Sequence, residues 1–130
     1  EPENCMVIRT SIIGEEIHKN ASLIAWVKSM KGKEANGFKN HWWNGITTNH
    51  YAEICQNIID NSLYEVDLFH VHSNTVDKHQ LLNLINDKFD LDIKISGIVT
   101  DVSVDRTLAS KKHLINKLNK KSIEQQIKEL

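Results

Sequence analysis

The residue best suited to bind an anion is Arg106, which stands in the stretch VDRTL beside Asp105 and before Thr107. A guanidinium can fork onto a phosphate or a carboxylate through two parallel hydrogen bonds. Hydroxyl residues in a polar segment that follows a strand suit such a site. The same residues also suit a surface or structural ion pair, and the sequence leaves both interpretations open.

Two adjacent tryptophans, Trp42 and Trp43, precede an expected helix in the stretch HWWNGITT. Adjacent residues of an extended segment face opposite ways, so at most one of the two rings can easily join the core. The other is either a lid on a neighbouring element or a platform on which a base or a sugar stacks. Asn44 and the threonines add hydrogen-bonding groups near a helix amino terminus, where anions are favoured.

Motifs for other kinds of chemistry are incomplete. Gly32 and Gly37 have the spacing of a phosphate-binding loop, but the Lys-Ser/Thr pair that must follow the second glycine is missing. No Gly-x-Gly-x-x-Gly follows a strand, and no Gly-x-Ser-x-Gly is present. His70 and His72 project from one face of a strand as a metal-ligand pair would, yet no third ligand has a defined spacing. We therefore expect neither a metal site nor a catalytic residue.

Helices are expected where apolar residues recur at helical spacing after a capping residue. The pattern predicts helices at residues 23–30, from about 48, and at about 77–89. Thr47 or Thr48 can cap the second of these, and Asp77 and Gln80 have the spacing of a capping box at the start of the third. A short helix at about 111–118 and a last helix that starts at Ser122 follow.

Short apolar runs between these helices indicate strands. The runs at 5–8 and 66–72 lack polar alternation, which is typical of strands covered on both faces in a parallel sheet. A further strand is expected at 93–99. Strands that alternate with helices predict the α/β fold class, and 130 residues are enough for one domain.

Composition indicates which kinds of partner to expect and in which cellular compartment the protein functions. The formal net charge of −1 predicts no general attraction to nucleic acid or to a membrane. Cys5 and Cys55 each fall in an apolar run, which predicts two reduced, buried thiols and a cytoplasmic protein. The sequence does not begin with methionine, which suggests a segment of a longer chain.

Four stretches in order, VIRTSIIGEE, NHWWNGITTNHYAEICQNII, LFHVHSNTVDKHQLLNLI and VDRTLASKKHLINKL, together resemble one family. They look like the carboxyl-terminal half of extended short-chain dehydrogenases/reductases that act on nucleotide sugars. The resemblance runs from about residue 5 to the end and is greatest to the dTDP-4-dehydrorhamnose reductase-like branch.

The resemblance implies that the two halves of the full-length protein have different roles. In the family, the first half is a Rossmann domain with a glycine-rich loop and a Tyr-x-x-x-Lys catalytic pair. Here the residues four places after Tyr51 and Tyr64 are Cys55 and Leu68, so the pair is absent. The resemblance therefore implies that NAD(P)H is bound mainly by a missing amino-terminal half and that this segment is inactive alone.

The resemblance also implies the fold of residues 1–130 as a single carboxyl-terminal substrate-binding segment. Residues 5–11 and 66–72 would be the last strands of a Rossmann sheet, and the remainder would form the small α/β substrate-binding lobe. Two strands without their normal neighbours are a liability for an isolated segment.

By the same resemblance, five residues are expected to contact the substrate. In the family, the turn that matches Trp43 and Asn44 faces the cleft between the two lobes, and the arginine that matches Arg106 is expected near the diphosphate. Ser11 and Ile13 follow the strand whose end lies near the nicotinamide and the sugar. The family often has an aromatic residue where this chain has Ile13.

The function implied is the sugar-nucleotide-binding part of an NAD(P)-dependent reductase that reduces the C4 keto group of a 4-keto-6-deoxy sugar. The alternatives are an epimerase of the same family, a reductase acting at another carbon, and a non-catalytic binding or regulatory subunit. The implied partners are a nucleotide-diphosphate sugar and the missing Rossmann half, with a homodimer as a further option.

Overall fold

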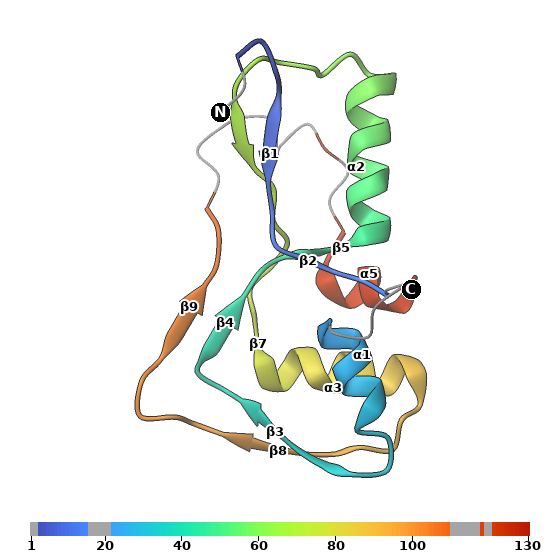
Figure 1. The fold of residues 1–130 in the computed structure, drawn as a ribbon, viewed down its shortest axis with the longest axis vertical. Helices are drawn as coiled ribbons and strands as arrows, with labels where there is room; N and C mark the ends of the chain where they lie inside the picture. Colours follow the sequence, from blue (N-terminus) through green and yellow to red (C-terminus); the bar gives the residue numbers. More distant parts are fainter. Residues whose placement is uncertain (1–2, 16–21, 110–117, 119–120) are drawn as a thin grey trace.

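The chain folds into two packed regions, which lie one above the other in Figure 1. The computed structural model describes residues 3–15, 22–109, 118 and 121–130. Each region has its own cluster of buried apolar side chains. Strands and helices alternate along the chain, which confirms the α/β fold class predicted from the sequence.

In the upper region, one helix covers a pair of parallel strands. β1 (Val7–Arg9) pairs in parallel with β6 (Leu68–His70), as the two unalternating apolar runs predict. α2 (Thr48–Asp60) packs its buried isoleucines against Phe69 of this pair. Because parallel strands need a crossover connection, the chain that leaves β1 builds much of the lower region before it returns to β6.

The two regions meet at a second parallel pair, formed by β2 (Ile12–Ile13) and β5 (Ile46–Thr47). α5 (Ile123–Lys128) packs against β5 at this junction. The side chain of Gln126 is buried there, and its Oε1 accepts a hydrogen bond of 2.9 Å from the backbone nitrogen of Thr47. The buried amide is therefore satisfied, and it ties α5 to the strand pair.

The lower region contains a three-stranded sheet and a separate pair of strands. β4 (His41–Trp43) lies in the centre of the sheet, antiparallel to β7 (Val76–Asp77) and parallel to β9 (Val104–Arg106). β3 (Glu34–Phe38) and β8 (Lys94–Ile98) form the parallel pair. Figure 1 shows how the two sets of strands follow one another around the left and lower margins of the region.

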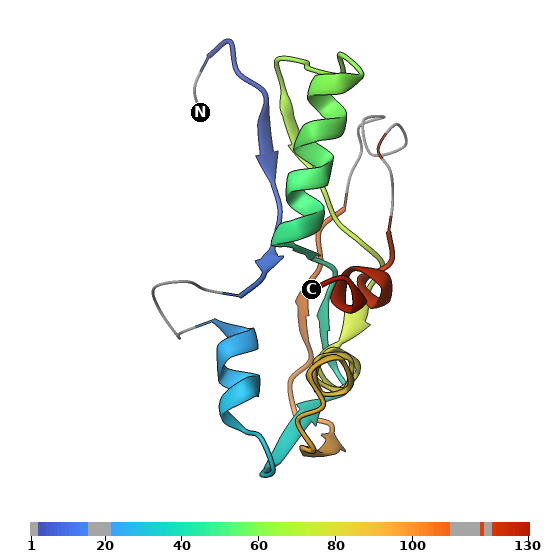
Figure 2. The same cartoon turned by 90° about the vertical axis from the view of Figure 1, so that its right-hand side faces the viewer.

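α3 (Lys78–Phe89) is the helix around which the lower region packs. It contacts α1 (Leu23–Ser29) and the β3–β8 pair, and Figure 2 shows it beside α1 and above these two strands. The strand pair meets the helix at two register partners, Gly37 and Gly97. A Cβ at Gly37 would lie 2.6 Å from the Cα of His79, so glycine is required for this close approach.

Capping residues predicted from the sequence start the helices where expected. Thr47 caps α2, and its Oγ1 accepts from the backbone nitrogen of His50 at 3.2 Å. Asp77 and Gln80 form both hydrogen bonds of a capping box at the start of α3. Ser122 caps α5. These local bonds explain why the helices are the elements that the sequence predicts best.

Several short strands of the lower region were not predicted from the sequence. β3 lies in the stretch that was rejected as a phosphate-binding loop, and β9 lies in a segment expected to be a polar loop. Both are partly exposed and lack a regular apolar alternation, so distant partners rather than local pattern hold them as strands. The expected helix at about 111–118 falls almost wholly outside the described residues.

The prediction that both cysteines are buried is wrong. Cys5 is exposed and Cys55 is half-buried, and both thiols are free. Cys5 lies in a turn before β1, and Cys55 is one position off the stripe of α2 that buries Ile54 and Ile58. Within the described ranges, none of the helices has the length and apolar character that crossing a membrane would require.

His50, near the start of α2, is a buried titratable group at the junction of the two regions. Its side chain is 4% exposed, and within the described part of the chain its Nδ1 has no hydrogen-bond partner. Burial lowers the pKa of His50, and Lys121 acts in the same direction while Glu53 and Glu129 oppose it. The folded chain therefore favours the neutral imidazole.

We predict that acidification weakens the wild-type fold more than it weakens a His50→Gln variant. As pH falls through about 6.5, the unfolded chain takes up a proton on His50 before the folded chain does, so the free energy of unfolding decreases. Urea midpoints at about pH 7.5 and about pH 5 measure the effect. Equal decreases in the two proteins would show that His50 does not contribute.

Candidate functional site

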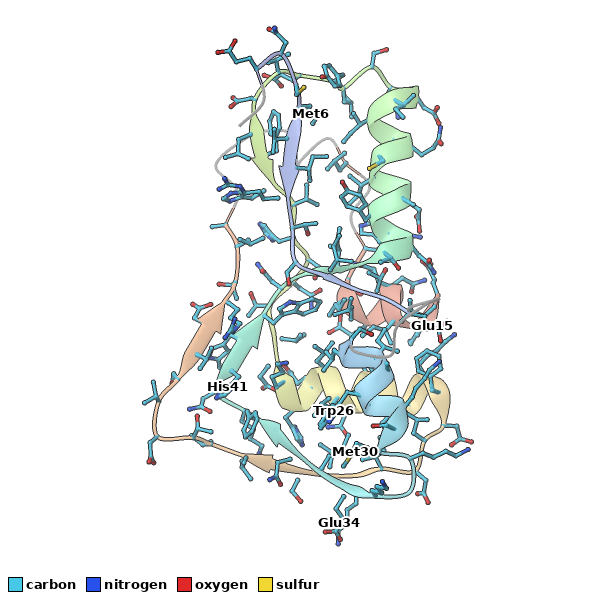
Figure 3. The ribbon with its side chains drawn as sticks, viewed as in Figure 1. Met6, Glu15, Trp26, Met30, Glu34 and His41 are labelled. Atoms are coloured by element: carbon cyan, nitrogen blue, oxygen red, sulfur yellow. The ribbon has the colours of Figure 1, made fainter. Side chains whose placement is uncertain are left out.

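A hollow of about 570 Å³ opens in the lower region between α1, α3 and the strands, and we refer to it as the cleft. Figure 3 labels Trp26 on α1 and His41 at the start of β4, two of the residues that line it. The lining draws on residues from six parts of the chain: Ser11, Ile13, Leu23, Trp26, Asn36, Phe38, His41, Trp42, Trp43, Lys78, Leu81, Leu82, Val104 and Arg106.

Trp43 and Arg106, which the sequence analysis placed at one site, are brought together by β-sheet pairing. They are register partners in the parallel strands β4 and β9, so their side chains leave the sheet on the same face. Trp43 is 8% exposed, and its Nε1 donates a hydrogen bond of 2.6 Å to Ser11 Oγ. Trp42 is 39% exposed, which confirms that only one ring of the pair joins the core.

The glycine of the stretch WWNG is explained by the position of the Trp43 ring. A Cβ at Gly45 would lie 2.2 Å from Trp43 Cζ2 and 2.3 Å from the carbonyl oxygen of Ser11. That carbonyl accepts a hydrogen bond of 2.8 Å from the backbone nitrogen of Ile46. Only glycine leaves room for the indole and the chain at Ser11 to lie against this turn, so the turn and the cleft form together.

Asn44 lies beside the cleft and is absent from its lining. Its side chain is 4% exposed, its Nδ2 donates to the carbonyl oxygen of Leu108 at 2.7 Å, and its Oδ1 accepts from the nitrogen of Leu108 at 2.8 Å. Both ends of the amide are thus bonded to the chain just after β9. Asn44 holds that segment, and through it the strand that carries Arg106.

The carboxylate of Asp105, the residue before Arg106, is hydrogen-bonded to Thr107. Asp105 Oδ1 accepts from the backbone nitrogen of Thr107 at 2.9 Å and from its Oγ1 at 2.6 Å, and these bonds lower the pKa of Asp105. Asp105 is the register partner of Trp42, so its side chain leaves the sheet on the face opposite to Arg106. The adjacent acid therefore does not neutralise the cleft.

The cleft carries positive charge from two elements. Lys78, the first residue of α3, is half-buried, and burial followed by the charge of Arg106 lowers its pKa. Among the described residues that line the cleft, none is an aspartate or a glutamate. A concave surface with aromatic walls and two cations favours an anionic ligand that has a flat ring. Lys78 was not predicted from the sequence, where its one local signal is its place directly after the cap Asp77.

A second hollow of about 580 Å³ lies at the carboxyl end of β1. Ser11 borders both hollows, and Tyr51 of α2 contributes to the second one. The carboxyl ends of parallel strands are where open α/β sheets commonly bind ligands. The two hollows are therefore neighbours that share one wall.

No metal centre is found in the described part of the chain, where no group of three or more His, Cys, Asp or Glu side chains could hold an ion. The two histidines considered from the sequence have backbone partners. His70 Nδ1 lies 3.2 Å from the carbonyl oxygen of Ala109, and His72 Nδ1 lies 3.0 Å from that of Ser73.

No protein-family model matches the sequence, nor does any curated protein sequence. The fold, by contrast, is similar to that of several solved structures. A dTDP-4-dehydrorhamnose reductase from Bacillus anthracis in complex with NADP is 12% identical, with a TM-score of 0.70 over 95% of this chain and 46% of that one. A dTDP-4-dehydrorhamnose reductase from Clostridium acetobutylicum is 15% identical, with a TM-score of 0.68 over 95% and 46% of the two chains.

A UDP-glucose 4-epimerase from Thermotoga maritima, solved with UDP-glucose, is 14% identical, with a TM-score of 0.64 over 95% of this chain and 43% of that one. At such identities the similarity shows the fold, and it confirms the fold resemblance predicted from the sequence. The chain spans less than half the length of each of these three structures.

We predict that Gly45→Ala lowers the free energy of unfolding by about 1–3 kcal/mol, because the added methyl group overpacks the contact between Trp43 and Ser11. Urea unfolding followed by circular dichroism measures the change. Gly32→Asn is the matched control: φ is +70° there, which asparagine tolerates, and a Cβ meets nothing within 4 Å. A Gly45→Ala variant as stable as the control would contradict the packing described for this turn.

Proposed function

We propose that this chain is the sugar-nucleotide-binding part of an NAD(P)-dependent nucleotide-sugar reductase that acts on a 4-keto-6-deoxy sugar. The observation that carries the proposal is the composition of the cleft. All three tryptophans of the chain and two cations, Lys78 and Arg106, line one hollow, and no carboxylate among the described residues lines it. The fold similarity to dTDP-4-dehydrorhamnose reductases supports this assignment.

In the proposed complex, the parts of the ligand follow the chemistry of the cleft. The ring of Trp26 on α1, which is 46% exposed, offers a face on which a base or a sugar can stack. Arg106 stands at the rim, where a guanidinium can bind the diphosphate through paired hydrogen bonds. Ser11 and Ile13 border the end nearer to β1, where the sugar would lie.

Trp43 and Asn44 support this arrangement in different ways. Trp43 is nearly buried and forms the floor under the ligand, with its indole nitrogen already bonded to Ser11. Asn44, named from the sequence as a contact, has both ends of its side chain bonded to Leu108. We assign it the role of holding the strand that carries Arg106.

In the proposed enzyme, NAD(P)H supplies the hydride that reduces the sugar. The NADP bound in the Bacillus anthracis structure supports the use of this cofactor by proteins of the fold. The residues present here do not fit the whole cofactor, because the sequence has no Gly-x-Gly-x-x-Gly to cradle its diphosphate. The chain also lacks a Tyr-x-x-x-Lys pair, so its own role is to bind and orient the sugar nucleotide while a Rossmann half carries the reaction.

A nucleotide-sugar epimerase of the same fold is the second candidate, and the similarity to a UDP-glucose 4-epimerase solved with UDP-glucose favours it. A cytoplasmic location and the option of a homodimer belong to the same proposal. The two free thiols are in keeping with a reducing compartment.

We predict that dTDP or UDP quenches the tryptophan fluorescence of the chain, because all of its tryptophans border the cleft. Arg106→Ala should weaken binding by roughly 1.5–3 kcal/mol, which corresponds to roughly tenfold or more in dissociation constant. Titration at low salt, where exposed charges are least screened, measures both effects.

Lys94→Ala is the control for the loss of one positive charge, since Lys94 is exposed on β8 and does not line the cleft. It should bind like the wild type. If neither nucleotide quenches the wild-type fluorescence, or if Arg106→Ala binds as tightly as the control, the proposed function is wrong. A preference for UDP over dTDP would favour the epimerase candidate.

A further inference from the structure

We infer that Lys78 is a second phosphate-binding residue of the cleft, and that with Arg106 it selects ligands that carry a diphosphate over those that carry a single phosphate. The inference rests on the proposed function and adds to it a residue that determines specificity. It is drawn from the sheet topology and from the unfavourable position that Lys78 occupies in the fold.

The topology places the two cations on either side of Trp43. β4 lies between β7 and β9, with Trp43 paired to Val76 on one side and to Arg106 on the other. Lys78 follows directly after β7 and also lines the cleft. Because neighbouring strands lie about 4.8 Å apart, the two long side chains can converge over Trp43 from opposite directions. Two adjacent phosphates fit such a pair better than one.

Lys78 is poorly placed for the stability of the fold alone. It is the first residue of a helix of 12 residues, where the helix dipole is positive and a cation is disfavoured. The first turn of α3 contains no acidic residue, and the carboxylate of the cap Asp77 accepts from the backbone nitrogen of Gln80 at 2.8 Å. Burial and the nearby Arg106 disfavour the ammonium charge further, and both lower the pKa of Lys78.

A bound diphosphate would relieve each of these unfavourable terms. It would replace the water lost on burial, offset the charge of Arg106 and lie at the amino terminus of α3, where anions are stabilised. A side chain whose charge is disfavoured where it lies, and which the rest of the fold does not stabilise, indicates a functional requirement. The compensation at Lys78 is therefore assigned to the ligand.

Few other charged groups face Lys78 across the cleft. β9 contributes Arg106 and β4 contributes His41, while Asp77 and His79 are its neighbours along the chain. The described residues that α1 and β3 bring to the cleft do not titrate: they are Leu23, Trp26, Asn36 and Phe38. Lys78 is the one lysine among the described residues that line the cleft.

The test compares dTDP with dTMP on Lys78→Met, Lys78→Arg and the control Lys94→Met, by tryptophan fluorescence at about pH 8, where the phosphates are fully ionised. We expect Lys78→Met to weaken dTDP binding on the order of tenfold, to change dTMP binding much less, and so to lose the preference for the diphosphate. Lys78→Arg should restore most of the affinity, and Lys94→Met should bind like the wild type.

A pH titration separates a direct contact from a structural role. Binding needs the charged lysine, and burial and the nearby Arg106 lower the pKa of Lys78, so the affinity of the wild type for dTDP should fall over the alkaline pH range in which Lys78 loses its proton. Lys78→Arg should show no such fall, because arginine keeps its charge in that range. A wild-type profile that matches that of Lys78→Arg would overturn the inference.

The stability of Lys78→Met provides the second readout. Because the ligand-free fold disfavours the charge, the urea midpoint of this variant should equal or exceed that of the wild type. A large loss of stability in Lys78→Met overturns this inference and leaves the proposed function intact. The same holds if the wild type binds dTDP and Lys78→Met binds it equally tightly. Absence of dTDP and UDP binding by the wild type overturns the proposed function itself.

Discussion

The packing of the Trp43 indole against Ser11 and Gly45 is the contact on which the cleft depends. It fixes the carboxyl end of β4, and the pairing of Trp43 with its neighbours then places Val76 in the core and Arg106 at the rim. The same contact joins the end of β1 to the lower region, because Ser11 lies at the start of the second strand pair. The shape of the cleft and the link between the two regions therefore have a common origin.

The second constraint is the distribution of charge. Carboxylates near the cleft have partners of their own: Asp105 is bonded to Thr107, and Asp77 caps α3. The cations remain on the cleft side, where Lys78 and Arg106 lower the cost of bringing an anion in from water. Such an arrangement weakens the fold slightly, because like charges lie close together, and it is commonly found at binding sites.

The parts of the structure that depend on interactions between residues close in sequence were predicted, and those that depend on distant residues were not. The starts of the helices were predicted because residues such as Thr47 and Asp77 act on backbone groups only a few positions away. The division of the tryptophan pair was predicted from the alternation of an extended chain. β3 and β9 were missed because they are held by pairing with distant strands.

The candidate site was predicted only in part, because its residues are also brought together by contacts between distant parts of the chain. Arg106 and Trp43 were recognised as chemically suited residues, and β-sheet register brought them to one face. Asn44 was expected to face a ligand, but its hydrogen-bonding groups are used on a segment 64 positions away. Lys78 was overlooked because neither its burial nor the charge of Arg106 near it has a local signal.

The most direct test of the account is a crystal structure of the chain with dTDP bound. The account predicts density for the diphosphate within hydrogen-bonding distance of Lys78 Nζ and of the Arg106 guanidinium, with the base against a tryptophan ring of the cleft. Density for the diphosphate in the second hollow at the carboxyl end of β1, with the cleft left to solvent, would contradict it.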